Sequence, residues 1–518
     1  MAQQCSLRNA HGRWVLAATM LASSTVFLMG TAVTVALPAI QTYFATGVTS
    51  LQWIVNANLL MLSSLLLVGG SLGDQLGRKL VFLPGMAVFS CGAVLSGLAT
   101  SVPMLIAFQA IQGIGSAFMV PQTLAIINDC FPEDERGQAI GLWAGLSGGV
   151  TAFGPWLGGL LVQELSWRAV FFMAVPISAV AFILSAMFIP RGERSATPRI
   201  DWQGTLLIFL GLFGVAYAFI TGPNGGWNNL PVLLALGVGL ACVVLFAFAE
   251  RRQPQPLLPL RLFRNPLVAG ANTVTLFLYS ALNAIIFFTV LNLEQLQGYS
   301  PTMAGLGLLP PTALITIFAG PAGALADRIG PRLQMIVGPL LVALGSAALA
   351  SAGRQASYIA NFLPGLALFG LGMSLVIAPL TKSALWVEQR LSGAASGTNN
   401  AVSRVAAVMA IAVVGAIVIS AFSTRLAETM SASTLNRTQQ AQILTQSNAL
   451  AGIKIPDSFD QQDRLVAQRA VGNAFAYGFR WAMWVSSGLA LAAAVTSFLT
   501  IRSPSPITSD RAGRQQPT

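Results

Sequence analysis

The sequence predicts an all-α membrane protein with about fourteen transmembrane helices, on the criterion that a span needs roughly 20 apolar residues. Apolar residues make up 55% of the 518 positions and charged residues only 9%, whereas a soluble domain carries about 25% charged residues. The chain also contains 50 glycines, and glycine is more frequent in membrane helices than in soluble ones. These observations exclude an ordinary soluble globular protein.

The apolar runs divide the chain into two six-helix bundles with two helices inserted between them. The N-terminal bundle, 14–200, is expected to hold spans at 14–37, 51–72, 80–99, 103–127, 138–162 and 168–189. The inserted segment, 201–250, holds spans at 203–221 and 230–249. The C-terminal bundle, 251–501, holds spans at 267–292, 303–326, 333–351, 357–380, 399–420 and 478–501, with a long extracytoplasmic loop at 421–477. Residues 1–13 and 502–518 remain as tails.

Basic residues orient these spans in the membrane. The connections expected outside, at 38–50, 99–102 and 222–229, contain no Lys or Arg, whereas inner turns carry pairs such as Arg78-Lys79. Cytoplasmic loops carry the excess of Lys and Arg. We therefore predict a multi-pass protein of the cytoplasmic (inner) membrane with both termini cytoplasmic. The first apolar run has no small-residue cleavage site and is expected to be retained.

Composition also argues against several functional classes. The net charge of +11 comes from short clusters between apolar runs, a pattern that favours membrane orientation and lipid contact over nucleic-acid binding. The only histidine, His11, and the four scattered cysteines (Cys5, Cys91, Cys130, Cys242) provide no metal-ligand or Cys/His catalytic pattern. Without a P-loop or a Ser/His/Asp set, we expect neither an enzyme nor a bound cofactor or metal.

Two turns repeat the same pattern. Gly70-Ser-Leu-Gly-Asp74-Gln-Leu-Gly77-Arg78-Lys79 follows the second span, and Gly323-Ala-Leu-Ala-Asp327-Arg-Ile-Gly330-Pro-Arg332 follows the tenth. Internal repeats of this kind are typical of transporters. Glycine permits a tight turn, and an aspartate can interact with a facing helix N-terminus. These residues are candidates for a conformational latch: Gly70, Asp74, Gly77, Arg78, Lys79, Asp327 and Arg332.

The fifth span has a second motif, in which small residues surround a proline. It contains Gly154, Pro155, Gly158 and Gly159. Small residues let helices approach closely, and the proline removes one backbone hydrogen bond. Simple helix packing is the alternative interpretation of this motif.

The two motifs together resemble those of the major facilitator superfamily, specifically its fourteen-helix drug:proton antiporter group. The resemblance implies a secondary transporter that exposes one cavity alternately to each side of the membrane, with the repeated turn as a latch and the fifth helix typical of exporters. It further implies a small-molecule substrate and, in most members, a proton. We expect a monomer and leave open a periplasmic adaptor.

The sequence departs from this family at the positions that usually carry protons. Met29 stands where relatives have an aspartate in the first helix, and Gln109 replaces an arginine in the fourth. A carboxylate in a low-dielectric cavity can exchange a proton near neutral pH, so its loss removes the evident relay. The remaining candidates for coupling are Glu294 and Arg404. For each, an interfacial side chain with its charged head in water or at lipid phosphates is the alternative.

Polar and aromatic residues within the spans are candidates for the substrate cavity: Thr34, Trp53, Asn58, Gln109, Gln112, Tyr279 and Asn283. Such amides also join membrane helices to one another. As a set they favour a neutral, amphipathic or anionic substrate over a permanently cationic drug. The leading hypothesis is a multidrug-efflux-like exporter, and the alternatives are an exporter of one endogenous metabolite or lipid, or a transport-inactive sensor with the same fold.

Overall fold

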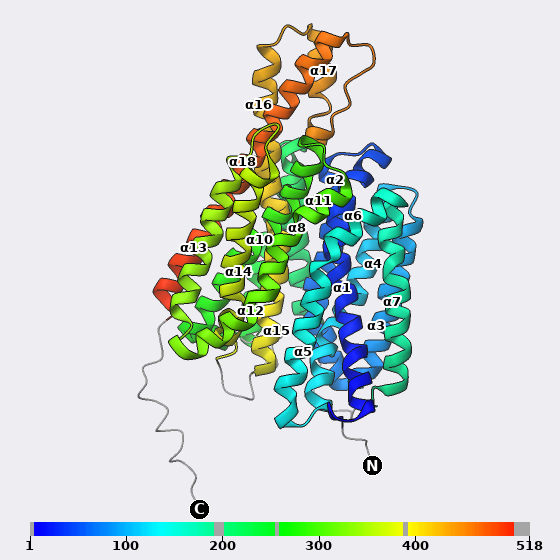
Figure 1. The fold of residues 1–518 in the computed structure, drawn as a ribbon, viewed down its shortest axis with the longest axis vertical. Helices are drawn as coiled ribbons and strands as arrows, with labels where there is room; N and C mark the ends of the chain where they lie inside the picture. Colours follow the sequence, from blue (N-terminus) through cyan, green and yellow to red (C-terminus); the bar gives the residue numbers. More distant parts are fainter. Residues whose placement is uncertain (1–4, 191–200, 254–257, 259, 387–391, 502–518) are drawn as a thin grey trace, which may run out of the picture.

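The computed structural model describes residues 5–190, 201–253, 258, 260–386 and 392–501. Within these ranges it is helical and contains 14 helices that are long and apolar enough to cross a membrane, which confirms the predicted number. Figure 1 shows them as one bundle, in which α1 begins and α18 ends at the same end. We call this end the base and the opposite end, above which α17 lies, the cap end.

The N-terminal bundle holds the first six spans. Its helices are α1 (Ala10–Phe44), α2 (Val48–Leu76), α3 (Arg78–Leu98), α4 (Val102–Cys130), α5 (Glu133–Ala152), α6 (Gly154–Glu164) and α7 (Trp167–Phe188). The fifth span consists of α5 and α6, which meet at Phe153. A disulfide between Cys5 and Cys130 ties the segment before α1 to the end of α4.

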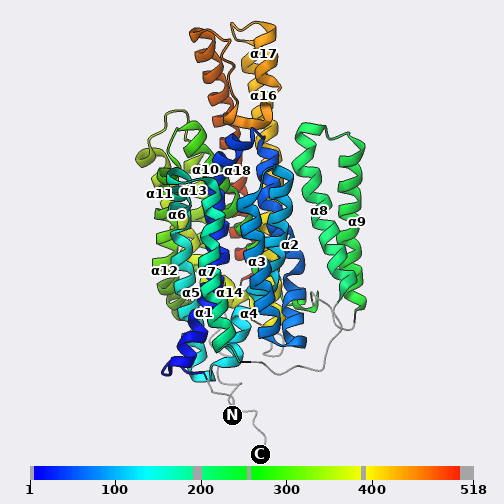
Figure 2. The same ribbon diagram turned by 90° about the vertical axis from the view of Figure 1, so that its right-hand side faces the viewer.

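The inserted pair is α8 (Trp202–Gly225) and α9 (Leu230–Arg252). Figure 2 shows these two helices on one side of the bundle, with α8 next to α2. Leu212, Ala216 and Ile220 of α8 pack with Leu60 of α2 and Val408 of the C-terminal bundle. One helix of the pair therefore contacts both halves, while α9 presents Leu233, Leu240 and other large apolar side chains to the outside.

The C-terminal bundle begins after a short 3₁₀ turn, η1 (Leu260–Arg264). Its helices are α10 (Pro266–Leu291) with the π-turn η2 (Asn292–Leu296), α11 (Pro301–Gly307), α12 (Leu309–Ile329), α13 (Arg332–Leu349), η3 (Tyr358–Phe362) with α14 (Leu363–Ala384), α15 (Ser392–Met409) with η5 (Ala410–Val414) and α16 (Gly415–Ser431), and α18 (Gln461–Thr500).

The segment 421–477, predicted as a long loop, is largely helical. The end of α16, α17 (Arg437–Leu444), the 3₁₀ turn η6 (Ser447–Gly452) and the start of α18 form a structure that we call the cap. Phe422, Leu426 and Met430 recur at intervals of four residues and are buried. Such spacing places them on one face of a helix, and α16 packs this face against α18. The helices therefore continue beyond the predicted ends of the spans.

In one span of each half, a proline stands at a break between two helices. Pro155 has no N–H to donate to the carbonyl of Thr151. The hydroxyl of Thr31 on α1 lies 3.5 Å from that oxygen and 3.0 Å from the carbonyl of Leu28 in its own helix. In the C-terminal half, Pro311 leaves the carbonyl of Gly307 without its helical partner, and the hydroxyl of Tyr358 donates to it at 2.8 Å. Each of these two spans is therefore built from two helices, α5 and α6 in one case and α11 and α12 in the other.

Candidate functional site

The two repeated turns adopt the same backbone conformation at their last glycine. Gly77 has a φ of 101° and Gly330 a φ of 83°, a region that side chains with a Cβ rarely occupy. Each glycine ends a helix at the base and precedes another. The repeat predicted from the sequence is therefore structural, and only glycine permits this turn without strain.

Ion pairs occupy the first turn. Arg78 pairs with Asp74 four residues earlier, and its Nε lies 3.3 Å from Oδ2 of Asp129 at the end of α4. Lys79 donates to the carbonyls of Ala186 and Ile189 at 2.7 Å each. The first latch candidates thus join α2, α3, α4 and the end of α7 within the N-terminal half.

The second turn differs in its partners. Arg332 lies over the ring of Phe498 on α18, with its guanidinium carbon 5.5 Å from the ring centroid. Asp327 belongs to α12 at the base, the end at which Asp74 also lies. The side chain of Asp327 is outside the described part of the structure.

The motif of the fifth span lies on two packing surfaces. Gly154 and Gly158 face Thr31 and Ala32 of α1, within the N-terminal half. Gly159 instead faces the backbone of Pro301 at the start of α11, and Gly305 of α11 faces the backbone of Pro155. A Cβ at either of the last two glycines would overlap the facing carbonyl oxygen. The motif therefore brings the two halves into backbone contact near the cap end.

Several predicted cavity residues lie within the N-terminal half. Gln109 donates to Ser96 Oγ at 3.0 Å and to Gln112 Oε1 at 2.8 Å, and both glutamines are buried. Asn58 Nδ2 lies 3.4 Å from the carbonyl of Gln109. Trp53 faces Phe213 and Tyr217 of α8. These contacts connect α2, α3, α4 and α8, so they support helix packing at these positions. Thr34 donates to the carbonyl of Gly30 in its own helix.

Met29, the position of the missing acid, is 3% exposed and belongs to the main apolar cluster. The structure therefore surrounds this position with apolar side chains such as Val26 and Val33. Met29 thus makes apolar contacts, and Gln109 forms a neutral amide pair with Gln112.

Arg404, in contrast, lies between the halves. Its guanidinium carbon is 5.7 Å from the ring centroid of Phe27 on α1, and it interacts electrostatically with Tyr279 on α10. Among the described residues, no acceptor bonds to its buried Nε. The neighbouring Asn283 donates to the carbonyl of Tyr279 at 2.8 Å. Arg404 thus lies near Phe27 of α1 and Tyr279 of α10, which belong to opposite halves.

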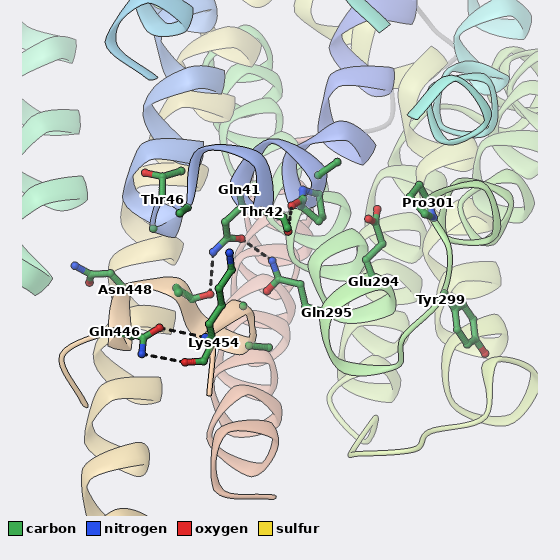
Figure 3. Close-up of a pocket in the computed structure, with 17 residues that line it drawn as sticks. Gln41, Thr42, Thr46, Glu294, Gln295, Tyr299, Pro301, Gln446, Asn448 and Lys454 are labelled. Atoms are coloured by element: carbon green, nitrogen blue, oxygen red, sulfur yellow. Dashed lines mark hydrogen bonds between the residues drawn. The ribbon is translucent and has the colours of Figure 1, made fainter. Parts of the chain in front are cut away.

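Glu294 lies in a different place, a pocket of about 520 Å³ at the cap end. The wall comes from three units: the end of α1, the segment from η2 to Pro301, and η6 of the cap. Figure 3 shows Gln41 between the cap and Gln295. Its Nε2 donates to the carbonyl of Ala449 at 2.9 Å, and its Oε1 accepts from Gln295 Nε2 at 2.7 Å. One glutamine thus joins both halves and the cap.

Sequence reasoning identified Glu294 and did not identify its neighbours. Gln41 follows the predicted end of the first span, and Asn448 and Lys454 lie in the predicted loop. A segment interpreted as a loop carries no prediction of which other residues its side chains contact. The sequence signal that was available is the presence of Ile443, Leu450 and Ile453 among polar residues. In the structure these three side chains are buried.

Comparison with known proteins identifies the family. Residues 19–411 match the family model described as Major Facilitator Superfamily. The chain belongs to the major facilitator superfamily. It is 32% identical to the multidrug resistance protein Stp of Mycobacterium tuberculosis, over 79% of this chain and 76% of that protein. It is 29% identical to the tetracenomycin C resistance and export protein of Streptomyces glaucescens, over 92% and 89% of the two chains.

A solved structure confirms the fold of this superfamily transporter. The chain aligns with a bacterial homologue of the human lysosomal transporter Spinster, in its inward-facing and unoccupied conformation, with a TM-score of 0.66 and 17% identity over 96% of this chain and 98% of the other. The D-xylose-proton symporter gives a TM-score of 0.59 at 14% identity, over 95% and 98% of the two chains. The predicted family, the major facilitator fold and the multi-pass membrane architecture are therefore confirmed.

Proposed function

We propose that this transporter exports small amphipathic molecules, neutral or anionic, from the base of the bundle to the cap end by alternating access. The base faces the cytoplasm and the cap lies outside the cytoplasmic membrane, in agreement with the basic residues Arg78 and Lys79 at the base. Relatives named for multidrug resistance and for tetracenomycin C resistance and export support outward transport of antibiotics. In this proposal the chain acts alone as a monomer and performs no chemical reaction on its substrate.

The observation that carries the substrate class is Arg404 between the two halves. Placing an arginine at the centre of a membrane helix costs about 3 kcal/mol unless it is paired or hydrated. Its Nε has no acceptor among the described residues, so a bound oxygen acceptor would satisfy it. Phe27 lies at 5.7 Å and offers an aromatic surface beside it. An aromatic substrate with a carboxylate, phenolate or carbonyl group fits this combination.

The repeated turns and the fifth-span motif are proposed to control the transport cycle. The ion pairs of Arg78 with Asp74 and Asp129 lie at the base, whereas the Gly159 and Gly305 contacts lie near the cap end. Opening to the outside separates the Gly159 and Gly305 contacts near the cap end and brings the bases of the two halves together. The turns then act as a latch, because their charged residues reach facing helix ends only in that arrangement.

Proton coupling, where it operates, is assigned to Glu294. Met29 and the Gln109–Gln112 pair leave the N-terminal half without a central carboxylate. Oε1 of Glu294 is buried and accepts no hydrogen bond from a described residue. Glu294 belongs to η2 of the C-terminal half and lines the outer pocket, a position from which a proton can be exchanged with the outside.

The test is efflux from cells that lack their own multidrug exporters. Accumulation of a fluorescent aromatic carboxylate is compared with that of its methyl ester and of an aromatic cation. Wild type is expected to lower accumulation of the first two, and Arg404→Gln to impair export of the carboxylate most. Arg437→Gln, an exposed arginine at the start of α17, is the matched control and should behave as wild type.

Four outcomes would contradict the proposal. Export of the cation alone, or equal loss of all substrates in Arg404→Gln, would remove the assigned substrate class. Unchanged accumulation across the panel, with purified protein that still binds the carboxylate, would favour a sensor that has kept the transporter fold. Export restricted to one metabolite or lipid would favour the narrower exporter.

A further inference from the structure

The outer pocket has an excess of hydrogen-bond acceptors. Three of its lining residues carry a buried oxygen that accepts no hydrogen bond from the described part of the chain: Glu294 Oε1, Gln295 Oε1 and Asn448 Oδ1. A buried polar atom without a partner costs about 1–3 kcal/mol. A ligand that supplies donors would satisfy these atoms once the three side chains turn towards the pocket.

The direction of the amides follows from a backbone carbonyl. The oxygen of Ala449 can only accept, so Gln41 must direct its Nε2 towards it. Gln41 Oε1 then accepts from the amide nitrogen of Gln295. This second bond leaves Oε1 of Gln295 as a free acceptor. The hydrogen-bond chain therefore determines which amide atom is the oxygen in Gln41 and in Gln295.

The size and the remaining wall of the pocket indicate what carries the donors. A volume of about 520 Å³ lies within the range of small-molecule sites, roughly 300–1,000 Å³. Apolar groups complete the wall, among them Pro38, Ala39 and Ala451. A bare metal ion would leave this wall unused, and among the described residues no cluster of metal-ligating side chains is present.

We propose that this pocket is an extracytoplasmic binding site for a small amphipathic ligand that carries a protonated amine. The N–H groups of the ammonium donate to Glu294, Gln295 and Asn448, and the hydrocarbon part contacts the apolar wall. This chemistry is opposite to that of Arg404 between the two halves, which requires an acceptor. The ligand class therefore differs from the substrate class proposed above, and the two sites are separate.

Lys454 also lines the pocket and opposes a cationic ligand. It is exposed at the rim, and its ammonium has the same charge as the ligand. In water such a like-charge repulsion is small, of the order of 1 kcal/mol at close range. Removing the charge should therefore strengthen amine binding modestly, whereas removing the carboxylate of Glu294 should weaken it. The two variants change affinity in opposite directions.

The experiment is calorimetric binding to the purified full-length protein in detergent, with phenethylamine as the probe. The trimethylammonium analogue keeps the ring and the charge but has no N–H donor. We expect phenethylamine to bind wild type, and the analogue to bind about tenfold more weakly, the factor that corresponds to one or two lost hydrogen bonds. Glu294→Gln should weaken phenethylamine by a similar factor, and Lys454→Gln should strengthen it about twofold to fivefold.

Controls separate the site from nonspecific partition into detergent. Glu164→Gln removes an exposed carboxylate at the end of α6, outside the pocket, and should leave affinity unchanged. Asn448→Ala changes only the cap and should weaken binding even if Glu294→Gln proves poorly folded. Absence of binding to wild type, or equal affinities for the two probes and for all variants, would overturn the proposal. Because no transport is measured, failure here is distinguishable from failure of the exporter function.

Discussion

Gly159 of α6 lies directly against the backbone carbonyl of Pro301, the first residue of α11. The reciprocal contact joins Gly305 of α11 to the carbonyl of Pro155. The two halves of the transporter therefore touch backbone to backbone near the cap end, and each contact depends on the absence of a single methyl group. Outward opening has to separate these two pairs.

Adding a methyl group at Gly159 should disturb these backbone contacts between α6 and α11. In Gly159→Ala the new Cβ overlaps the Pro301 carbonyl, and overpacking of this kind costs about 1–3 kcal/mol. We expect the closed outer side to be destabilised and efflux to fall several-fold. The control is Gly149→Ala on α5, where a Cβ meets nothing within 4 Å. Wild-type efflux in Gly159→Ala, measured at equal protein levels, would contradict the claim that transport depends on this close contact.

The latch predicts coupling between two aspartates that share one arginine. Asp74 and Asp129 both contact Arg78. Their side chains are 52% and 61% exposed, so each pair contributes only about 0–1 kcal/mol to stability. We therefore expect Asp74→Asn and Asp129→Asn to slow efflux without much loss of folded protein.

In the double variant the two effects should be less than additive, because one arginine mediates both. Asp457→Asn, which alters an exposed ion pair with Arg464 in the cap, should leave efflux intact. If the effects of Asp74→Asn and Asp129→Asn on efflux simply add in the double variant, Arg78 does not couple the two aspartates.

Tyr358 should contribute to stability through its hydroxyl. It donates to the carbonyl of Gly307, which Pro311 cannot serve. Tyr358→Phe leaves that carbonyl without a partner, at a cost of about 1–3 kcal/mol, and should lower the melting temperature by several degrees in detergent. Tyr477→Phe is the matched control, because Tyr477 is an exposed tyrosine on α18. Equal melting temperatures for the two variants would contradict this role.

Proton coupling can be tested at two positions in proteoliposomes with an imposed pH gradient. Glu294→Gln keeps the shape of the side chain and removes its proton, and it should abolish any acceleration of transport by the gradient. Glu428→Gln, an exposed carboxylate paired with Arg425, should not. Gradient-driven transport that survives in Glu294→Gln would exclude Glu294 as the coupling group.

Met29→Asp restores the family's acid at a buried, apolar position. A carboxylate there should reduce folded protein, since an acid at the centre of a membrane helix costs about 3 kcal/mol. Met29→Asn, of similar size without the charge, gives the reference for folding. New gradient dependence in Met29→Asp alone would show that the native chain has lost this relay.

The fold could be predicted because its signals are local and strong. Each membrane span needs an apolar run of about 20 residues. The repeated turns at Gly77 and Gly330 indicate in the sequence that the two halves are related. The ends of the spans were less predictable. Helix α1 extends to Phe44 and α16 to Ser431. Side chains such as Met430 are buried in this extension, and composition alone does not predict that packing.

The candidate sites could be predicted only in part. Arg404 and Glu294 were identifiable because a charged residue within a span is rare. The partners of amides were not, since Gln109 bonds to Ser96 while Gln41 bonds to Ala449, 408 residues away. Which amide packs a helix and which lines a pocket depends on helix rotation and on contacts distant in sequence.

The central claim is that the two halves expose their shared cavity alternately. Spin labels placed at Gln163 and Met303 report the cap-end separation, and labels at Gln138 and Arg328 report the base. These four positions are exposed, and labelling uses a background in which Cys91 and Cys242 are replaced by serine. The distances between the labels are measured by pulsed electron–electron double resonance, with and without the transported carboxylate and at two pH values. Alternating access predicts that the cap-end distance increases whenever the base distance decreases, whereas distances that stay fixed, or that change in the same direction, would contradict it.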